Sequence, residues 1–177
     1  MRRAIIVFTR VPVAGQTKTR LMPYFSPQEC AGLHTCFLKD IAGQCQKTQA
    51  DLYICYTPDD KGAALKTVFG DDKIYFPQMG ESLGERMYMA IQRVLAKDYG
   101  SCVLIGTDVP EIKQADLDYA FRLLDVHDIV LGPTQDGGYY LVGMKKPVRE
   151  MFEKQTYSHA SVLENTAKAA FEAGYTV

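Results

Sequence analysis

The sequence predicts an α/β fold of three layers, in which helices cover both faces of a mostly parallel central sheet. Short apolar segments with strand-forming residues alternate along the chain with amphipathic helical segments, as expected of strand–helix–strand units. Two of the apolar segments, Ala4–Phe8 and Cys102–Ile105, are apolar throughout, which is typical of strands buried on both faces. Of residues 1–177, 47% are hydrophobic, so we expect one domain with a single sizeable core.

The loop that follows the first predicted strand, residues 9–24, carries a cluster of positive charge. Gly15 lies within it, and three basic side chains occupy eleven positions with no acid among them: Arg10, Lys18 and Arg20. Backbone N–H groups and basic side chains after a central strand can converge on one phosphate, so we interpret the loop as a phosphate site. A solvated basic loop is the alternative, and the GxxxxGK[ST] pattern of a Walker A motif is absent.

A long amphipathic helix is predicted from about Pro27 to Lys47, because Ser26 and Glu29 form a capping box in front of an apolar stripe. His34 lies on that stripe, and we interpret it as a packed histidine rather than a ligand. The next predicted elements are a strand at Leu52–Tyr56, a helix between Pro58 and Gly70, and a strand at Ile74–Phe76.

A second capping box, Ser82 with Glu85, begins a helix that we expect to reach about Lys97, with Leu83 the first residue of its buried stripe. Arg86 falls in the first turn of that helix, where a positive side chain opposes the helix dipole. Its position indicates a nearby anion, and an exposed surface arginine is the alternative.

The strand Cys102–Ile105 leads into Gly106-Thr107-Asp108, and Pro110 prevents the strand from continuing. Ligands of open α/β sheets bind just outside the carboxyl ends of the strands. An aspartate at that position can hold a hard divalent cation against phosphate oxygens, and a turn-capping aspartate is the alternative.

The last third of the chain predicts a helix around Leu117–Leu124, strands at Asp128–Leu131 and Tyr139–Gly143, and a helix over Tyr157–Gly174 capped by Ser158 or Ser161. We expect the strand that ends at Gly143 to pair antiparallel at one side of the sheet. Asp136-Gly137-Gly138 is typical of a hairpin turn. The same turn also presents a second carboxylate and a bare backbone that a ligand could approach.

Composition excludes several classes of function. The net charge is 20 − 21 = −1, which argues against a nucleic-acid partner, and no stretch approaches the ~20 apolar residues of a membrane span. The five cysteines have no CxxC spacing and the histidines are scattered, which argues against a zinc site. We expect five reduced thiols and a cytoplasmic protein, with three of the thiols on the buried face of the first long helix: Cys30, Cys36 and Cys45.

Four sequence blocks occur in order: FTRVPVAGQTKTRL, QMGESLGERM, LIGTDVPEI and GPTQDGGYYLVGM. Together they resemble the DUF2064 branch of the GT-A (nucleotide-diphospho-sugar transferase) superfamily, whose members are described as glycosyltransferases. The resemblance covers nearly the whole chain. The first block also looks like the KTRL loop of 2-phospho-lactate guanylyltransferases, and the expected fold resembles that of molybdenum-cofactor guanylyltransferases.

The resemblance implies a Rossmann-like GT-A fold that binds a nucleotide sugar or a nucleoside triphosphate with Mg²⁺ or Mn²⁺. Asp108 would be the metal ligand, and Asp108 and Asp136 would be the catalytic residues. The nucleotide and its phosphates would be bound by Arg10, Gly15, Lys18, Arg20, Arg86 and Thr107. The sugar or acceptor side would be lined by Gly137, Gly138 and Tyr139. A homodimer is a further expectation.

Three features depart from the family pattern, and one of them is Tyr157 in place of the family's usual Trp before the last helix. Pro110 stands where a second metal-binding acid would be. The family commonly continues beyond the position of Val177, so we expect the domain to lack the usual C-terminal extension. The first hypothesis is therefore a metal-assisted glycosyltransferase, and the alternatives are a nucleotidyltransferase of the guanylyltransferase type or a nucleotide-binding protein of the same fold with weak catalysis.

Overall fold

The computed structural model describes residues 1–153, 155, 157 and 159–177, and in these residues it contains a six-stranded sheet with the order β3-β2-β1-β4-β6-β5. The strands are β1 (Arg3–Arg10), β2 (Asp51–Thr57), β3 (Ile74–Pro77), β4 (Ser101–Ile105), β5 (Ile129–Pro133) and β6 (Tyr139–Met144). Strands β1 to β4 run parallel, while β6 runs antiparallel to both of its neighbours, β4 and β5. The predicted mostly parallel sheet is confirmed. The antiparallel strand lies inside the sheet, not at its side as expected.

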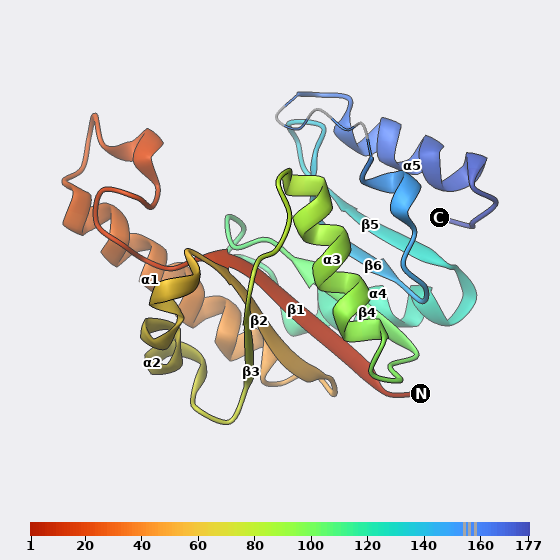
Figure 1. Ribbon diagram of the computed structural model, residues 1–177, viewed down its shortest axis with the longest axis horizontal. Coiled ribbons are helices and arrows are strands. Elements are labelled where there is room, and N and C mark those ends of the chain that lie inside the picture. Colours follow the sequence, from red (N-terminus) through yellow and green to blue (C-terminus); the bar gives the residue numbers. More distant parts are fainter. Residues whose placement is uncertain (154, 156, 158) are drawn as a thin grey trace.

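Helices cover both faces of this sheet, as Figure 1 shows. The helices are α1 (Pro27–Cys45), α2 (Lys66–Phe69), α3 (Leu83–Leu95), α4 (Gln114–Val126) and α5 (Val162–Glu172). Three short 3₁₀ turns accompany them: η1 (Thr19–Leu21), η2 (Asp59–Leu65) and η3 (Arg149–Met151). Helices α1, α2 and α4 pack on one face and α3 and α5 on the other, so the predicted three-layer arrangement is confirmed.

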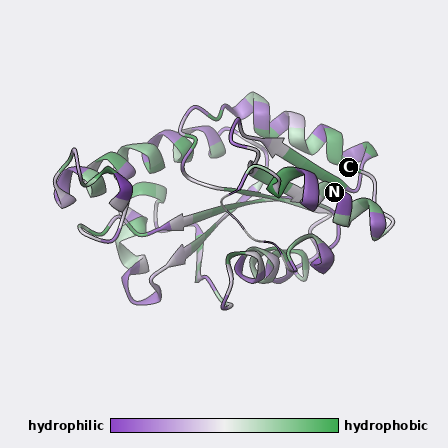
Figure 2. Cartoon of the chain, turned by 90° about the horizontal axis from the view of Figure 1, so that it is seen from above, coloured by the Kyte–Doolittle hydropathy of each residue, from purple (hydrophilic) through white to green (hydrophobic). Residues whose placement is uncertain are grey.

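Alternation along β1 supplies both halves of the core. Ile5 and Val7 pack under α1 and α4, whereas Ala4 and Ile6 pack under α3 and α5, and all four are fully buried. Figure 2 shows the strands coloured largely as hydrophobic between helices that carry hydrophilic stretches on their outer sides. A strand buried on both faces fixes the position of its own carboxyl end, and that end carries the basic loop.

Several predicted details differ from the structure. The helix expected after Pro58 is mostly a 3₁₀ helix that ends in the single turn of α2. Leu83 is 45% exposed, so it does not belong to the buried stripe of α3. The last helix begins at Val162, and Ser161 at its N-cap makes no side-chain capping bond. The alternative cap, Ser158, lies outside the described residues.

The capping box of α1 is confirmed, since Ser26 accepts from the Glu29 N–H and the Glu29 side chain accepts from the Ser26 N–H. The box expected at α3 is half formed. Ser82 accepts from the Glu85 N–H at 3.1 Å, but the Glu85 carboxylate accepts from the N–H of Glu81. Within the described residues, no helix is long and apolar enough to cross a membrane.

The five cysteines are free thiols, as predicted. Cys36 is exposed, so it does not lie on the buried face of α1 with Cys30 and Cys45. Burial raises the pKa of the Cys45 and Cys55 thiols to about 12.

We therefore expect a thiol reagent such as DTNB to modify one cysteine rapidly in the native protein, because only the thiolate reacts and four thiols are buried. All five should react after unfolding in guanidinium without reductant. Fewer than five reactive thiols in the unfolded protein would contradict this assignment.

Candidate functional site

The topological switch point of the sheet lies between the parallel strands β1 and β4. From β1 the chain moves to β2 and β3 on one side, and β4 then lies on the other side of β1. Such a switch point is where open α/β sheets bind ligands. The β1–β4 ladder ends at Val7 and Ile105, although β1 continues to pair with β2 as far as Arg10. The segments that follow β1 and β4 are therefore free to diverge at this edge of the sheet.

An ion pair joins those two segments. Lys18 Nζ lies 2.5 Å from Asp108 Oδ1, and so connects the loop after β1 to the turn after β4. The lysine has a left-handed backbone conformation, with φ of 53°, and its ammonium lies 4.6 Å from the centroid of the Phe37 ring. The Lys18 side chain is only 15% exposed, whereas that of Asp108 is 86% exposed. The lysine is thus held in place by packing, while the carboxylate remains open to solvent.

Beneath this pair, buried polar side chains connect the strand ends. Thr9 Oγ1 lies 3.1 Å from Thr107 Oγ1 and 3.3 Å from His34 Nε2. His34 Nε2 also lies 3.1 Å from the carbonyl oxygen of Arg10. His34 is 2% exposed, so the interpretation of a packed histidine is confirmed. The hydroxyl of Thr107 is occupied by this contact with Thr9.

The other residues of the basic loop are more dispersed. Arg10 is exposed at the end of β1, and alternation along the strand directs its side chain toward the α3 face, opposite to Thr9. Arg20 is exposed in η1, within the loop that projects from the body of the molecule in Figure 1. Gly15 has φ of 81° and nothing within 4 Å of a Cβ at its position, so backbone conformation explains this glycine.

The start of α3 also reaches the end of β1. Arg86 Nε donates to the Gly80 carbonyl at 2.9 Å and thereby closes the loop between β3 and α3. Gln78, which sequence reasoning missed, donates from Nε2 to the Thr9 carbonyl at 3.0 Å. Its position directly after β3 at the carboxyl edge was the signal that could have identified it.

The turn between β5 and β6 is held by its own hydrogen bonds. Asp136 Oδ1 accepts from Thr134 Oγ1 at 2.5 Å and from the Gly138 N–H at 3.2 Å, and these bonds lower the pKa of the Asp136 carboxyl. Gly137 has φ of 83°, and a Cβ there would lie 1.9 Å from the Ala160 carbonyl oxygen. Burial raises the pKa of Tyr139, whose ring packs against the core under α3 and α5.

The described residues contain no cluster of three or more histidine, cysteine or acidic side chains that could hold a metal ion. Asp108 offers an exposed carboxylate at the switch point, and the Lys18 ammonium already occupies a cation's position beside it. Mg²⁺ and Mn²⁺ accept oxygen ligands, and Mg²⁺ commonly binds through one or two carboxylates, waters and substrate phosphates. A cation at Asp108 would therefore need phosphate oxygens and waters to complete its coordination.

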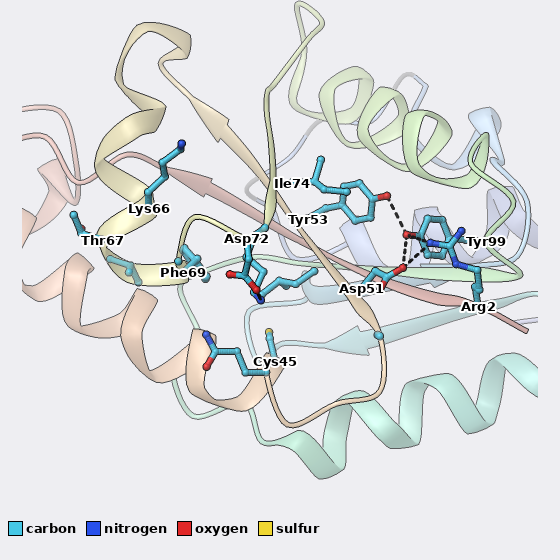
Figure 3. A pocket seen from close by; sticks show the side chains of 16 residues that line it. Arg2, Cys45, Asp51, Tyr53, Lys66, Thr67, Phe69, Asp72, Ile74 and Tyr99 are labelled. Carbon is cyan, nitrogen blue, oxygen red and sulfur yellow. Dashed lines mark hydrogen bonds and ion pairs between the residues drawn. The ribbon is translucent and has the colours of Figure 1, made fainter.

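A hollow of about 990 Å³ lies at the opposite, amino end of the strands (Figure 3). The charged side chains that line it are paired: Arg2 with Asp51, Lys66 with Asp71, and Lys73 with Asp72. Tyr99 OH donates to Asp51 Oδ2 at 2.6 Å and accepts from Arg2 at 2.9 Å. The charged side chains of this hollow are therefore already paired with one another in the free protein.

These bonds predict a loss of stability in acid. The hydrogen bonds from Tyr99 and Arg2 lower the pKa of Asp51, so the stability that they add is present above the unfolded-state pKa of about 3.9 and is lost as pH falls through the folded-state value. Urea unfolding of wild type and Asp51→Asn should differ most above about pH 5, and the difference should shrink toward pH 3. Asp51 is 53% exposed, so the effect is small, and a pH-independent difference would contradict it.

Sequence comparison identifies the family. The family model described as "Uncharacterized protein conserved in bacteria (DUF2064)" matches residues 41–159. The chain belongs to the DUF2064 family. The resemblance stated from the four sequence blocks is therefore confirmed. No protein with a curated description matches this chain.

Solved structures place this DUF2064 protein among known folds. A protein of Desulfovibrio desulfuricans G20, described as a "putative nucleotide-diphospho-sugar transferase", is 31% identical, with a TM-score of 0.93 over 100% of this chain and 79% of that one. The 4-diphosphocytidyl-2C-methyl-D-erythritol synthase of Anaerococcus prevotii DSM 20548 is 12% identical (TM-score 0.59; 97% of this chain, 83% of that one). Rv0371c of Mycobacterium tuberculosis H37Rv, in complex with manganese, is 16% identical (TM-score 0.53; 100% and 86%). The expected nucleotide-diphospho-sugar transferase-like fold is confirmed.

Proposed function

We propose that this DUF2064 protein is a metal-assisted glycosyltransferase that uses a nucleotide sugar. The observation that carries the proposal is the ion pair between Lys18 and Asp108, at the carboxyl ends of adjacent parallel strands and at the switch point of the sheet. The 31% identity to a structure described as a "putative nucleotide-diphospho-sugar transferase" supports the same class.

The pair suggests how a charged ligand would bind. In the free protein the two opposite charges satisfy each other. A diphosphate would bind the Lys18 ammonium, and a divalent cation would bind the Asp108 carboxylate. A diphosphate alone leaves Asp108 without its partner, and a cation alone does the same to Lys18. Binding of both ligands together is therefore favoured over binding of either one, and the coupling must be reciprocal.

Each charged group has a defined task in glycosyl transfer. Lys18, Arg20 and Arg10 would neutralise the charge that develops on the departing nucleoside diphosphate. Mg²⁺ or Mn²⁺ on Asp108 would add charge neutralisation at the same oxygens. Asp136, whose carboxylate is exposed in the turn before β6, is the proposed general base for the acceptor hydroxyl. Gly137, Gly138 and Tyr139 are proposed for the sugar or acceptor side.

Nucleotidyl transfer is the second candidate. Several structures with the same fold are named as cytidylyltransferases or diphosphocytidyl synthases. The Rv0371c structure, with manganese bound, supports a divalent ion in this fold. Both reactions would use the same phosphate and metal groups. They differ in whether the acceptor attacks the sugar carbon or the α-phosphate.

A ligand panel distinguishes the candidates. Melting temperature is measured with nucleotide sugars and nucleoside triphosphates in the presence of Mn²⁺, because a bound ligand stabilises the folded state. The stabilising ligands are then incubated with candidate acceptor sugars and sugar phosphates. Release of a nucleoside diphosphate supports glycosyl transfer, and release of pyrophosphate supports nucleotidyl transfer. Stabilisation without any product would indicate a binding protein, and no stabilisation by any ligand would reject the proposal.

A further inference from the structure

His34 is a buried titratable residue that the proposed chemistry does not use. It lies on α1 and contacts both Thr9 and the carbonyl of Arg10 at the end of β1. Its Nδ1 has no hydrogen-bond partner among the described residues, although it is buried. A buried polar atom without a partner is costly. All hydrogen bonds of the ring therefore lie on its Nε2 side, toward the strand ends.

The hydrogen-bond directions follow from the acceptor. A backbone carbonyl can only accept, so Nε2 carries the hydrogen and donates to the Arg10 oxygen. Thr9 Oγ1 donates to the same oxygen at 3.0 Å, which fills both lone pairs of that carbonyl. The Thr107 hydroxyl can then donate to Thr9 Oγ1. Burial lowers the pKa of His34, which keeps the ring neutral at pH 7.

This chain of bonds begins where the backbone ladder ends. The β1–β4 pairing stops at Val7 and Ile105, and the Thr9–Thr107 hydroxyl pair joins the two segments two residues further along each. His34 contacts Thr9, and Thr9 contacts Thr107, the residue before Asp108, so the ring is connected to the segment that carries the ion pair. The neutral hydrogen-bond network of His34, Thr9 and Thr107 therefore lies beneath the two charged side chains, Lys18 and Asp108.

We propose that His34 is a positioning residue, which holds the end of β1 against the end of β4 through the Arg10 carbonyl and the Thr9–Thr107 pair, and so fixes the spacing between Lys18 and Asp108. This inference rests on the proposed function, because the spacing matters when a phosphate and a divalent cation bind together. A change in the spacing between Lys18 and Asp108 weakens the coupling between the two ligands. The phosphate must contact Lys18 and the cation must contact Asp108 while the two ligands also contact each other.

The test measures coupling directly. Mn²⁺ binding is followed by electron paramagnetic resonance with and without inorganic pyrophosphate, a probe that does not depend on the unknown base. We expect pyrophosphate to tighten Mn²⁺ binding to wild type by roughly 5- to 150-fold, the usual range of coupling between two sites. His34→Leu should reduce the factor to about twofold or less, on that scale. His34→Gln places an amide N–H near the position of Nε2 and should restore most of it.

Leu38→Ala is the control, because Leu38 is a fully buried neighbour on α1 that makes none of these bonds. It lowers stability while leaving the coupling unchanged. If His34→Leu does not fold, Thr9→Val tests the same hydrogen-bond network and should give the same loss of coupling between Mn²⁺ and pyrophosphate.

The outcomes separate the two proposals. Full coupling in His34→Leu or in Thr9→Val, or no rescue by His34→Gln, overturns the positioning role and leaves the proposed function intact. Absence of pyrophosphate and Mn²⁺ binding in wild type overturns both. An equal loss of coupling in Leu38→Ala would assign the effect to general destabilisation of α1 and would also overturn the positioning role.

Discussion

Replacing Lys18 by methionine should have opposite effects on the two proposed ligands. Affinity for a nucleoside diphosphate should fall by about tenfold or more, because a charge-assisted hydrogen bond contributes roughly 1.5–3 kcal/mol. Affinity for Mn²⁺ alone should rise by roughly 1.4- to fivefold, because Asp108 loses a competing cation worth about 0.2–1 kcal/mol at an exposed site. Methionine keeps the apolar stem beside Phe37, so the melting temperature should change little.

Calorimetry with each ligand separately measures the two effects. Lys168→Met is the matched control, because it removes the lysine of an exposed ion pair on α5, far along the chain from the candidate site. This control should leave both affinities unchanged. Unchanged nucleotide affinity in Lys18→Met would contradict the role of the basic loop, and unchanged Mn²⁺ affinity would show that the ion pair does not compete with the cation.

Gly137→Ala should be among the most destabilising single changes in this chain. The residue has φ of 83°, and its new Cβ would lie 1.9 Å from the Ala160 carbonyl, a backbone atom that cannot rotate away. Strain at positive φ and overpacking together should cost on the order of 2–4 kcal/mol. For a chain of this size that is a fall in melting temperature of roughly 5–15 °C.

Gly138→Ala is the comparison within the same turn. Its φ lies outside the left-handed region, and its Cβ would meet only side-chain oxygens, at 3.1 Å from Thr134 and 3.4 Å from Asp136. It should cost much less stability, because those side chains can adjust. Equal melting temperatures for the two variants would contradict the packing explanation of Gly137.

Patterns of burial made most of the fold predictable. Ala4–Phe8 and Cys102–Ile105 carry the signature of strands buried on both faces, and both lie at the centre of the sheet. The position of β6 between β4 and β5 could not be predicted. The alternation of side chains along a strand shows which residues are buried, but it does not show which strands are its neighbours. The exposure of Leu83 was missed because helical periodicity predicts which face of a helix is buried. It does not predict where the sheet that covers this face ends.

The candidate site was predictable only as a set of residue types. Lys18 and Asp108 were predicted to lie at the same edge of the sheet because each follows the carboxyl end of a strand. The structure brings their side chains into contact. Their direct pairing was not predicted, because the sequence analysis assigned Asp108 to a divalent cation and Lys18 to a phosphate. Long-range contacts such as that from His34 to Arg10 depend on how α1 crosses the sheet, which local sequence does not encode. The DGG turn carries a hairpin pattern, yet its glycine at 137 is explained by contact with a segment more than twenty residues later.

We propose that Asp108 and the basic loop bind a cation and a diphosphate together. The most direct test is titration of wild type and Asp108→Asn with GDP, UDP and CDP, each with and without saturating Mn²⁺. Asparagine keeps the shape of the side chain and removes its charge. For the nucleotide that binds, Mn²⁺ should tighten wild-type affinity at least about fivefold and Asp108→Asn affinity less than about twofold. Without metal, Asp108→Asn should bind the nucleotide as well as wild type or up to about fivefold more tightly, because Lys18 loses its competing carboxylate. Metal-independent binding by the wild-type protein would contradict the claim.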